Sequence, residues 1–174
     1  MPTVPPPLAP PDPRTLDRAA DLLRVASRPV VIAGAQCRLA EDGAWLRALA
    51  EALPVPVLTA WRARGVLLEG HPLDLGLLTA SPEDDGLLGL ADLILLCGLD
   101  EEELAVSRWP YSALVVCLSR TRHGEHPVAP LVEVVGDLAL ILAELAPRLT
   151  GRTQVDWDMF ELDRLKKMRR SVRG

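Results

Sequence analysis

Short, almost purely aliphatic runs recur along this chain of 174 residues, and they constrain its fold more than any other feature. Valine, isoleucine and leucine follow one another in each run, without the apolar–polar alternation of a half-exposed strand. Such runs are typical of strands covered on both faces, as in a parallel sheet between layers of helices. We expect strands at PVVIAGA (29–35), PVPVLTA (54–60), DLILLCG (92–98), ALVVCLS (113–119) and LVEVVGD (131–137).

Helical patterns separate these runs. Asp12 and Pro13 suit the N-cap and the first position of a helix, RTLDRAADLLRVA. Its apolar face comprises Leu16, Ala19, Ala20 and Leu23. Further helices are expected at LALILAELAPRL (138–149) and at EDGAWLRALAEAL (41–53), the latter with helical spacing through Trp45, Leu49 and Ala52. The alternation predicts an α/β fold with a doubly wound (Rossmann-like) parallel sheet of five to six strands flanked by helices. Whether LDLGLL, within residues 62–85, is a sixth strand stays open.

The two ends of the chain differ in character from its middle. A proline-rich linker is expected at residues 1–11, the central α/β domain at 12–150, and a linker with an amphipathic basic helix at 151–174. Asp158 is a candidate cap for that last helix, whose apolar stripe comprises Met159, Leu162, Leu165 and Met168. The stripe either folds back or awaits a partner, so we expect a homo-oligomer or companion domains.

Composition limits the partners and the location. The net charge of −5 argues against nucleic acid as a partner. No apolar run approaches the roughly 20 residues that cross a bilayer, so no membrane segment is expected. The N-terminus lacks the basic and apolar regions of a signal peptide, which makes the cytoplasm the expected location. Cys37, Cys97 and Cys117 have no CxxC spacing, and we expect them to be buried structural thiols.

The turns that follow the strands are where an open parallel sheet binds ligands. The first of these turns, GAQCRLAEDG, begins with Gly34 but lacks G-x-G-x-x-G, and the chain contains no G-x-x-x-x-G-K-[ST]. A tight phosphate-binding loop is therefore not predicted. The acidic run 100–103 fits either a divalent cation or the first turn of a helix, and we expect the helix.

A histidine-containing loop is the remaining candidate for chemistry. His123 and His126, with Glu125 between them and Cys117 upstream, are residue types that bind metals. The HGEH spacing has no second pair to complete four ligands, so we expect a polar loop without a metal. The chain has no G-x-S-x-G and no evident pair of carboxylates for acid–base catalysis, so no catalytic residue is predicted.

Five segments in a fixed order resemble one family. They are the proline-rich lead-in with its helix, RPVVIAG (28–34), ALAEALPVPVLTAWRARGVLLEGHPLDLG (48–76), LADLILLCG (90–98), and VEVVGD, which ends at Asp137. Over residues 12–149 the chain resembles the central domain of thiamine-diphosphate-dependent enzymes of the acetolactate synthase and pyruvate oxidase type. The tail DWDMFELDRLKK resembles the linker helix that leads onward in such enzymes.

The resemblance implies a six-stranded parallel sheet between two cofactor domains. In relatives those neighbours hold thiamine diphosphate and Mg²⁺, one with a catalytic glutamate and the other with a Gly-Asp-Gly motif, which this chain lacks. The central domain of relatives binds FAD, ADP or nothing. FAD-binding relatives have glycine-rich segments where this chain reads GAQ (34–36), LLTA (77–80) and GLDE (98–101), so no cofactor is expected here. The residues nearest to any bound nucleotide would be Gly34, Arg62, Gly98 and Arg120.

Two functions follow from these observations. The first is a non-catalytic central domain of a thiamine-diphosphate-dependent enzyme, with a structural role between cofactor-binding domains. The alternative is a free-standing protein that has reused the fold to bind a nucleotide (FAD, ADP or NAD(P)) or to act as a sensor. The stretch 59–78, with Gly65 and the His71–Pro72 turn, is then either a connection that faces neighbouring domains or an ordinary surface crossover. A small hydrolase or transferase would need a nucleophile that the sequence does not show.

Overall fold

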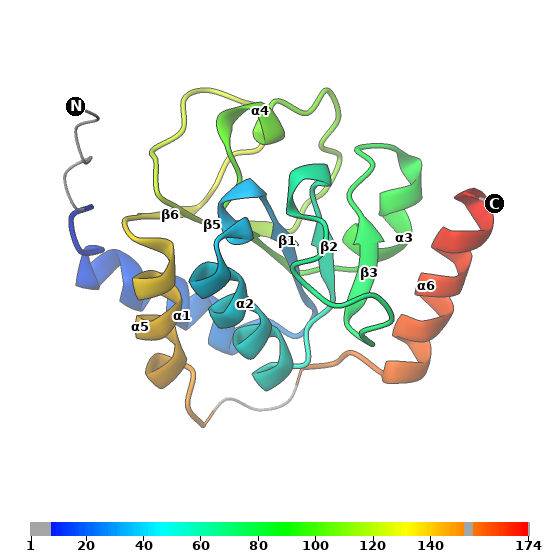
Figure 1. Ribbon diagram of the computed structural model, residues 1–174, viewed down its shortest axis with the longest axis horizontal. Coiled ribbons are helices and arrows are strands. Elements are labelled where there is room, and N and C mark those ends of the chain that lie inside the picture. The colour runs from blue at the N-terminus through cyan, green and yellow to red at the C-terminus, as the bar shows by residue number, and fades with distance from the viewer. Residues whose placement is uncertain (1–7, 152–154, 174) are drawn as a thin grey trace.

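The computed structural model describes residues 8–151 and 155–173, and it contains one sheet of six parallel strands (Figure 1). The strands are β1 (Pro29–Ala33), β2 (Val57–Thr59), β3 (Asp74–Leu77), β4 (Leu93–Cys97), β5 (Leu114–Ser119) and β6 (Val132–Val135). Their order across the sheet is β3-β2-β1-β4-β5-β6. The predicted parallel α/β fold is confirmed, and LDLGLL supplies the sixth strand.

Helices and short 3-10 turns connect the strands. The helices are α1 (Pro13–Val25), α2 (Ala40–Ala52), α3 (Asp85–Leu88), α4 (Glu101–Leu104), α5 (Leu138–Arg148) and α6 (Met159–Arg173). The 3-10 turns are η1 (Ala35–Arg38), η2 (Trp61–Ala63) and η3 (Pro82–Asp84). None of the helices in the described ranges is both long and apolar enough to span a membrane.

The core lies on both faces of the two central strands. Every residue of β1 and of β4 is buried, which explains why these runs are aliphatic throughout. On one side α2 packs against α5, and α5 against α1. The predicted apolar face of α1 is confirmed, and the Asp12 carboxylate accepts a hydrogen bond from the Arg14 N–H (3.2 Å), as expected of the N-cap.

The buried face of helix α2 differs from the face that the spacing of its apolar residues predicted. Leu49 is buried as expected, but Trp45 and Ala52 are exposed, and Leu46 and Ala50 point into the core instead. Trp45 lies at the rim of a surface hollow between α2 and α5. The spacing of large apolar residues alone is therefore misleading here, because the buried face of the helix also includes the small residues Gly43 and Ala50.

The terminal helices cover the two edges of the sheet. Helix α1 packs against β6, and α6 packs against β3 at the opposite edge (Figure 1). An uncovered edge strand offers unpaired backbone groups to other chains, so this arrangement protects the sheet. The division into residues 1–11, 12–150 and 151–174 stays a prediction, and residues 1–7 lie outside the described part of the chain.

The tail helix folds back onto the sheet. The Asp158 carboxylate accepts a hydrogen bond from the Phe160 N–H (2.9 Å), as expected of a cap. Leu162 and Leu165 are buried as predicted, whereas Met159 and Met168 of the predicted stripe are exposed. The third buried position of the face is not a methionine but an arginine, Arg169.

Arg169 fixes α6 to the strand edge. Its guanidinium group donates hydrogen bonds to the carbonyl oxygens of Leu75 (2.9 Å), Leu77 (2.5 Å) and Glu83 (3.0 Å). It also pairs with the fully buried carboxylate of Asp84 (3.2 Å). A buried arginine is favourable here because its donors have acceptors. An apolar side chain in its place would leave the Asp84 carboxylate and the three carbonyl oxygens without these hydrogen bonds.

We expect Arg169→Ala to lower the free energy of unfolding by about 3 kcal/mol, because Asp84 and the strand carbonyls lose their partner in a buried site. Urea denaturation followed by circular dichroism measures this loss. The matched control is Arg170→Ala, whose side chain is exposed on the same helix and which should change stability by no more than about 0.5 kcal/mol. Equal effects of the two substitutions would contradict the proposed role of Arg169.

Candidate functional site

The carboxyl ends of β1 and β4, called the crevice below, are where ligands are expected in a sheet of this order. Strand order reverses between these two neighbours, since β2 and β3 lie beyond β1 and β5 and β6 lie beyond β4. In open α/β sheets ligands bind at this point, outside the carboxyl ends of the strands. The turn after β1 begins at Gly34, and the turn after β4 begins at Gly98.

These two turns are pressed against each other. The Gly34 N–H donates to the carbonyl oxygen of Cys97 (2.9 Å), and a Cβ at Gly34 would lie 2.5 Å from the carbonyl oxygen of Gly98. Gly98 itself has a φ of +70°, which favours glycine. Both glycines are therefore needed for the close approach of the turns, with no need to invoke a bound phosphate.

A carboxylate of the protein occupies the anion position of the first turn. The Ala35 N–H donates to the Oε1 (3.0 Å) and Oε2 (3.2 Å) atoms of Glu103. Oε1 of Glu103 also accepts the Asp100 N–H (2.9 Å), and together with the Asp100 side chain it forms the capping box of α4. Backbone N–H groups at this turn are the ones that hold phosphate in nucleotide-binding relatives of the fold. Here Glu103 satisfies the Ala35 amide from within the chain.

Gln36 fills the next part of the crevice. Its Nε2 donates to Ser119 Oγ (3.0 Å) and Asp100 Oδ1 (3.2 Å), and its Oε1 accepts the Arg120 N–H (2.9 Å). One amide side chain thus links the turns that follow β1, β4 and β5. A ligand at this place would have to break these contacts.

The two predicted arginines stand beside this network. Arg62 forms an ion pair with Asp100 (3.3 Å), and the Arg120 guanidinium pairs with the buried carboxylate of Asp42. Burial raises the pKa of Asp42, and the charge of Arg120 opposes this rise. The structure therefore brings Gly34, Arg62, Gly98 and Arg120 around one crevice. Their assignment to a nucleotide stays a prediction, because both guanidinium groups already have carboxylate partners.

The stretch that follows β2 forms a turn-rich connection to β3. Gly65 has a φ of +89°, and the Leu73 N–H donates to Nδ1 of His71 (3.1 Å), which closes the turn at Pro72. The guanidinium carbon of Arg64 lies 4.6 Å from the centre of the Trp61 ring. This segment lines an open hollow of about 640 Å³ beside the ends of β2 and β3. The predicted roles of Gly65 and His71 in the turn agree with this geometry.

The thiols are buried, as predicted. Cys37 Sγ lies 3.9 Å from Cys97 Sγ in the core beneath the crevice. The contact with Cys37 and burial raise the pKa of Cys97, and burial raises the pKa of Cys117 to about 12. A nucleophilic cysteine needs a low pKa and access to solvent, so these thiols are unsuited to covalent catalysis.

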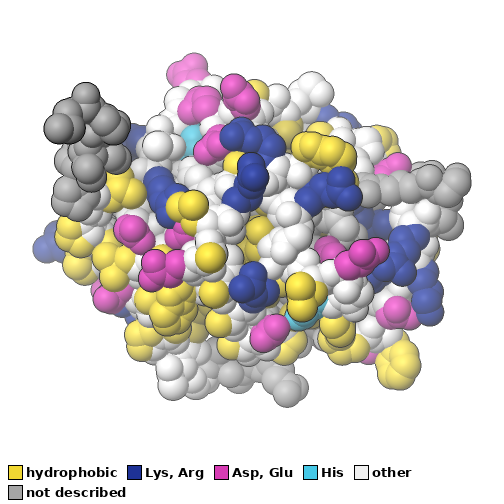
Figure 2. Space-filling model, viewed as in Figure 1, with side chains coloured by type: hydrophobic (Ala, Val, Ile, Leu, Met, Phe, Trp, Pro, Cys, Tyr) yellow, Lys and Arg dark blue, Asp and Glu magenta, His cyan; other side chains and the backbone are white. Residues whose placement is uncertain are grey.

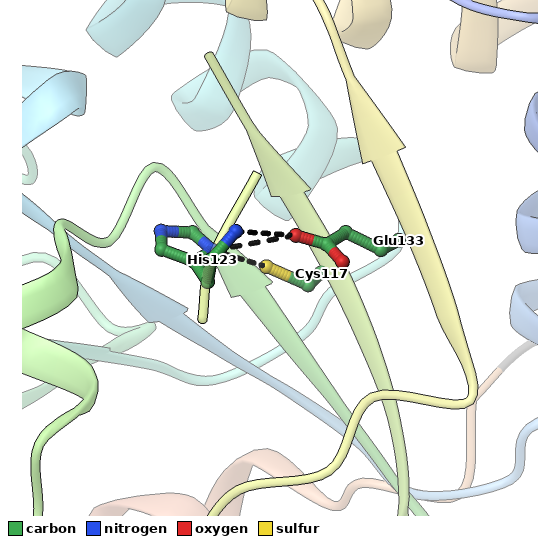
Figure 3. Close-up of side chains that lie close together, drawn as sticks. All are labelled: Cys117, His123 and Glu133. Carbon is green, nitrogen blue, oxygen red and sulfur yellow. Dashed lines mark hydrogen bonds and ion pairs between the residues drawn. The ribbon is translucent and has the colours of Figure 1, made fainter. Parts of the chain in front are cut away.

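A second group of polar side chains lies under the connection from β5 to β6. Cys117, His123 and Glu133 point toward one another (Figure 3), and their ligand atoms all lie within 4.8 Å of one another. The sequence singled out Cys117 and His123 but not Glu133, while Glu125 is exposed. Parallel pairing places Cys117 directly opposite Glu133, and the register of β5 and β6 is the signal that would have identified it.

The acidic run that was weighed as a cation site is the start of a helix. Residues Glu101, Glu102 and Glu103 form the first turn of α4, as predicted.

Elsewhere, hydrophobic side chains gather over α2 and α5 (Figure 2). They line a hollow of about 540 Å³ that includes Trp45, Leu142 and Ala146 but no charged residue, so it offers no group for catalysis.

The fold and these contacts define a class: a doubly wound, parallel α/β domain in which side chains of the protein itself link the turns at the point where the strand order reverses. Residues 16–145 match the family model described as thiamine pyrophosphate enzyme, central domain. The chain belongs to this family. The resemblance in the sequence is thereby confirmed for three quarters of the chain.

Individual relatives agree with this assignment. Human 2-hydroxyacyl-CoA lyase 2 is 30% identical over 89% of this chain, and the acetolactate synthase isozyme 1 large subunit of Escherichia coli is 28% identical over 83%. A solved structure described as a thiamin diphosphate-dependent enzyme isolated from Mycobacterium smegmatis superimposes with a TM-score of 0.64 at 23% identity, covering 84% of this chain and 30% of that one. The chain spans 26% of the length of each of the two enzymes, which makes their activities a matter of proposal here.

The described residues do not fit thiamine diphosphate with Mg²⁺. Magnesium is held by oxygen ligands, commonly carboxylates together with phosphates. Within residues 8–151 and 155–173, the group of three or more metal-binding side chains that lie together is Cys117, His123 and Glu133, which has one carboxylate only. The chain also contains no Gly-Asp-Gly, so no step of thiamine chemistry is assigned to it.

We expect Glu103→Ala to lower the free energy of unfolding by about 2 kcal/mol, because the amides of Ala35 and Asp100 lose a charged acceptor. Glu102→Ala is the matched control, since the neighbouring Glu102 side chain is 91% exposed and should contribute little. Thermal and urea unfolding of the three proteins measure the difference. If the two variants unfold alike, Glu103 does not hold the crevice together.

Proposed function

We propose that the chain is a non-catalytic, structural domain of an acetolactate synthase-like, thiamine-diphosphate-dependent enzyme, placed between domains that bind the cofactor. The observation that carries the proposal is the occupation of the crevice by Glu103 and Gln36. Family membership supplies the context, and the lack of fit to magnesium diphosphate supports a role without chemistry. The expected partners are the companion cofactor-binding domains or a second copy of the chain.

The alternative is a nucleotide-binding or sensor domain that uses Gly34, Arg62, Gly98 and Arg120. Such a ligand would have to displace the Glu103 carboxylate from the Ala35 amide and separate two arginines from their carboxylates. Each displaced charge-assisted hydrogen bond is worth about 1.5–3 kcal/mol, which the ligand would have to exceed before it bound at all. Residues around the crevice therefore favour the structural role.

Thermal shift measurements distinguish the two functions. We expect no change in melting temperature when FAD, NAD⁺, NADP⁺, ADP or coenzyme A is added up to 100 μM, about a hundred times a micromolar dissociation constant. A ligand that binds the native state at one micromolar would add about 2.7 kcal/mol at that excess. A clear upward shift with any of the five, lost in Arg120→Ala, would establish the nucleotide-binding alternative instead.

Activity and gene context test the structural role itself. The purified chain with thiamine diphosphate, Mg²⁺ and pyruvate should release no carbon dioxide above the protein-free rate, because it offers no groups for that chemistry. Segments that carry a Gly-Asp-Gly motif and a catalytic glutamate are expected in the same reading frame or in an adjoining one, and co-expression with them should give turnover. Turnover by the chain alone, or an active neighbour that ignores it, would refute the role.

A further inference from the structure

The cluster under the β5–β6 connection is built by two neighbouring strands and the loop between them. Cys117 of β5 and Glu133 of β6 are paired residues in the parallel register, so their side chains leave the same face of the sheet. His123 lies in the connection, and its ring faces both of them (Figure 3). Three residue types that bind transition metals thus converge from three segments of the chain.

The two separations from the histidine nitrogen are close to those of a tetrahedral ion, and all three ligand atoms lie within 4.8 Å of one another. His123 Nδ1 lies 3.5 Å from Glu133 Oε1 and 3.9 Å from Cys117 Sγ. With Zn–S at about 2.3 Å and Zn–N and Zn–O at about 2.0 Å, tetrahedral angles separate the ligand atoms by about 3.3–3.6 Å. Movements of a few tenths of an ångström would bring these two distances to coordination distance.

The histidine ring is held in the orientation that a metal ligand requires. His123 Nε2 lies 2.8 Å from the carbonyl oxygen of Leu99, which can only accept, so Nε2 carries a hydrogen. In the neutral ring Nδ1 is then the nitrogen with a free lone pair, and it faces Cys117 and Glu133. A backbone carbonyl that fixes the second nitrogen is the usual outer-shell partner of a metal-binding histidine. The His123 N–H in turn donates to Glu133 Oε1 (3.1 Å) and orients that carboxylate.

The three side chains are mostly buried, and a polar atom of a neighbouring histidine lacks a partner within the described part of the chain. Cys117 is buried, and the side chains of His123 and Glu133 are 2% and 19% exposed. In the same loop His126 has a buried Nδ1 without a hydrogen-bond partner among the described residues. Its ring centre lies 6.0 Å from that of His123. Hydrogen bonding within the protein therefore leaves this corner incomplete.

We propose that Cys117 Sγ, His123 Nδ1 and the Glu133 carboxylate bind one zinc ion, which fixes the 120–131 connection to the sheet. A thiolate with an imidazole selects zinc over magnesium or calcium. On binding, the thiol proton passes to solvent, and one thiolate with one carboxylate neutralises the two positive charges of the ion. The cluster of described residues supplies three ligands, which leaves one tetrahedral position for a water molecule.

Two other uses of the cluster are weaker. A cysteine nucleophile would need solvent access, which the buried Cys117 lacks. A metal-free arrangement, with His123 and Glu133 as a simple ion pair, accounts for the 3.5 Å contact but not for the thiol placed beside the same nitrogen. The zinc site and the metal-free ion pair differ in metal binding. Metal binding can be measured directly, and its outcome does not depend on the structural role proposed above.

Cobalt(II) titration of the full chain tests the zinc site. After treatment with a chelator and its removal, one equivalent of Co²⁺ should produce the near-ultraviolet charge-transfer band of a cobalt–thiolate bond, and one equivalent of Zn²⁺ should abolish it. Zinc should also raise the melting temperature, and the chelator should reverse this shift. Absence of both the band and the shift in the wild-type chain overturns the proposal, whatever the variants do.

Matched variants identify the ligands. Cys117→Ala should lose the thiolate band, whereas Cys37→Ala, which removes another buried thiol, should keep it. Glu133→Gln should weaken zinc binding at least tenfold, whereas Glu125→Gln, an exposed acid in the same loop, should not. Circular dichroism in the presence of chelator confirms that each variant is folded. A band that survives in Cys117→Ala, or equal affinities of the two glutamine variants, assigns the metal to other residues and refutes the site.

Discussion

The contact between the Glu103 carboxylate and the Ala35 amide joins the turns that follow the two central strands of the sheet. It lies where the strand order reverses, the place at which proteins of this fold bind the phosphates of nucleotides. A carboxylate within the chain gives that amide a charged acceptor without the entropy cost of binding a separate molecule. The amide of this turn therefore has its acceptor within the chain, and the strand order alone does not imply a bound nucleotide. Gln36 acts in the same way, since its side chain donates a hydrogen bond to Ser119 at the end of β5.

The same use of internal polar groups recurs at the edge of the sheet. Arg169 supplies donors to the carbonyl oxygens at β3 and the following turn, and so the tail helix closes a surface that would otherwise be open to another chain. The apolar stripe of the tail was the reason to expect a partner for it. Because Leu162 and Leu165 are buried within this chain, these two side chains need no partner domain to cover them.

The sequence was sufficient to predict the architecture, because strands that are buried on both faces consist almost entirely of aliphatic residues. The aliphatic runs of β1 and β4 and the apolar face of α1 are recognisable without coordinates, since each is a local pattern. The contacts of the crevice are not local. Glu103 and Ala35 are 68 residues apart, and Glu133 faces Cys117 only through the register of two strands. Trp45 and Met168 show the limit of patterns too, because a large apolar residue is buried only if the neighbouring elements leave room for it.

Hydrogen exchange at the Ala35 amide, measured by nuclear magnetic resonance with and without added FAD or ADP, tests the central claim most directly. If Glu103 holds this amide, its exchange is slow in the chain alone and does not change when either nucleotide is added. An amide that exchanges as fast as an exposed turn, and becomes protected only with a nucleotide present, would show that the crevice is an open binding site.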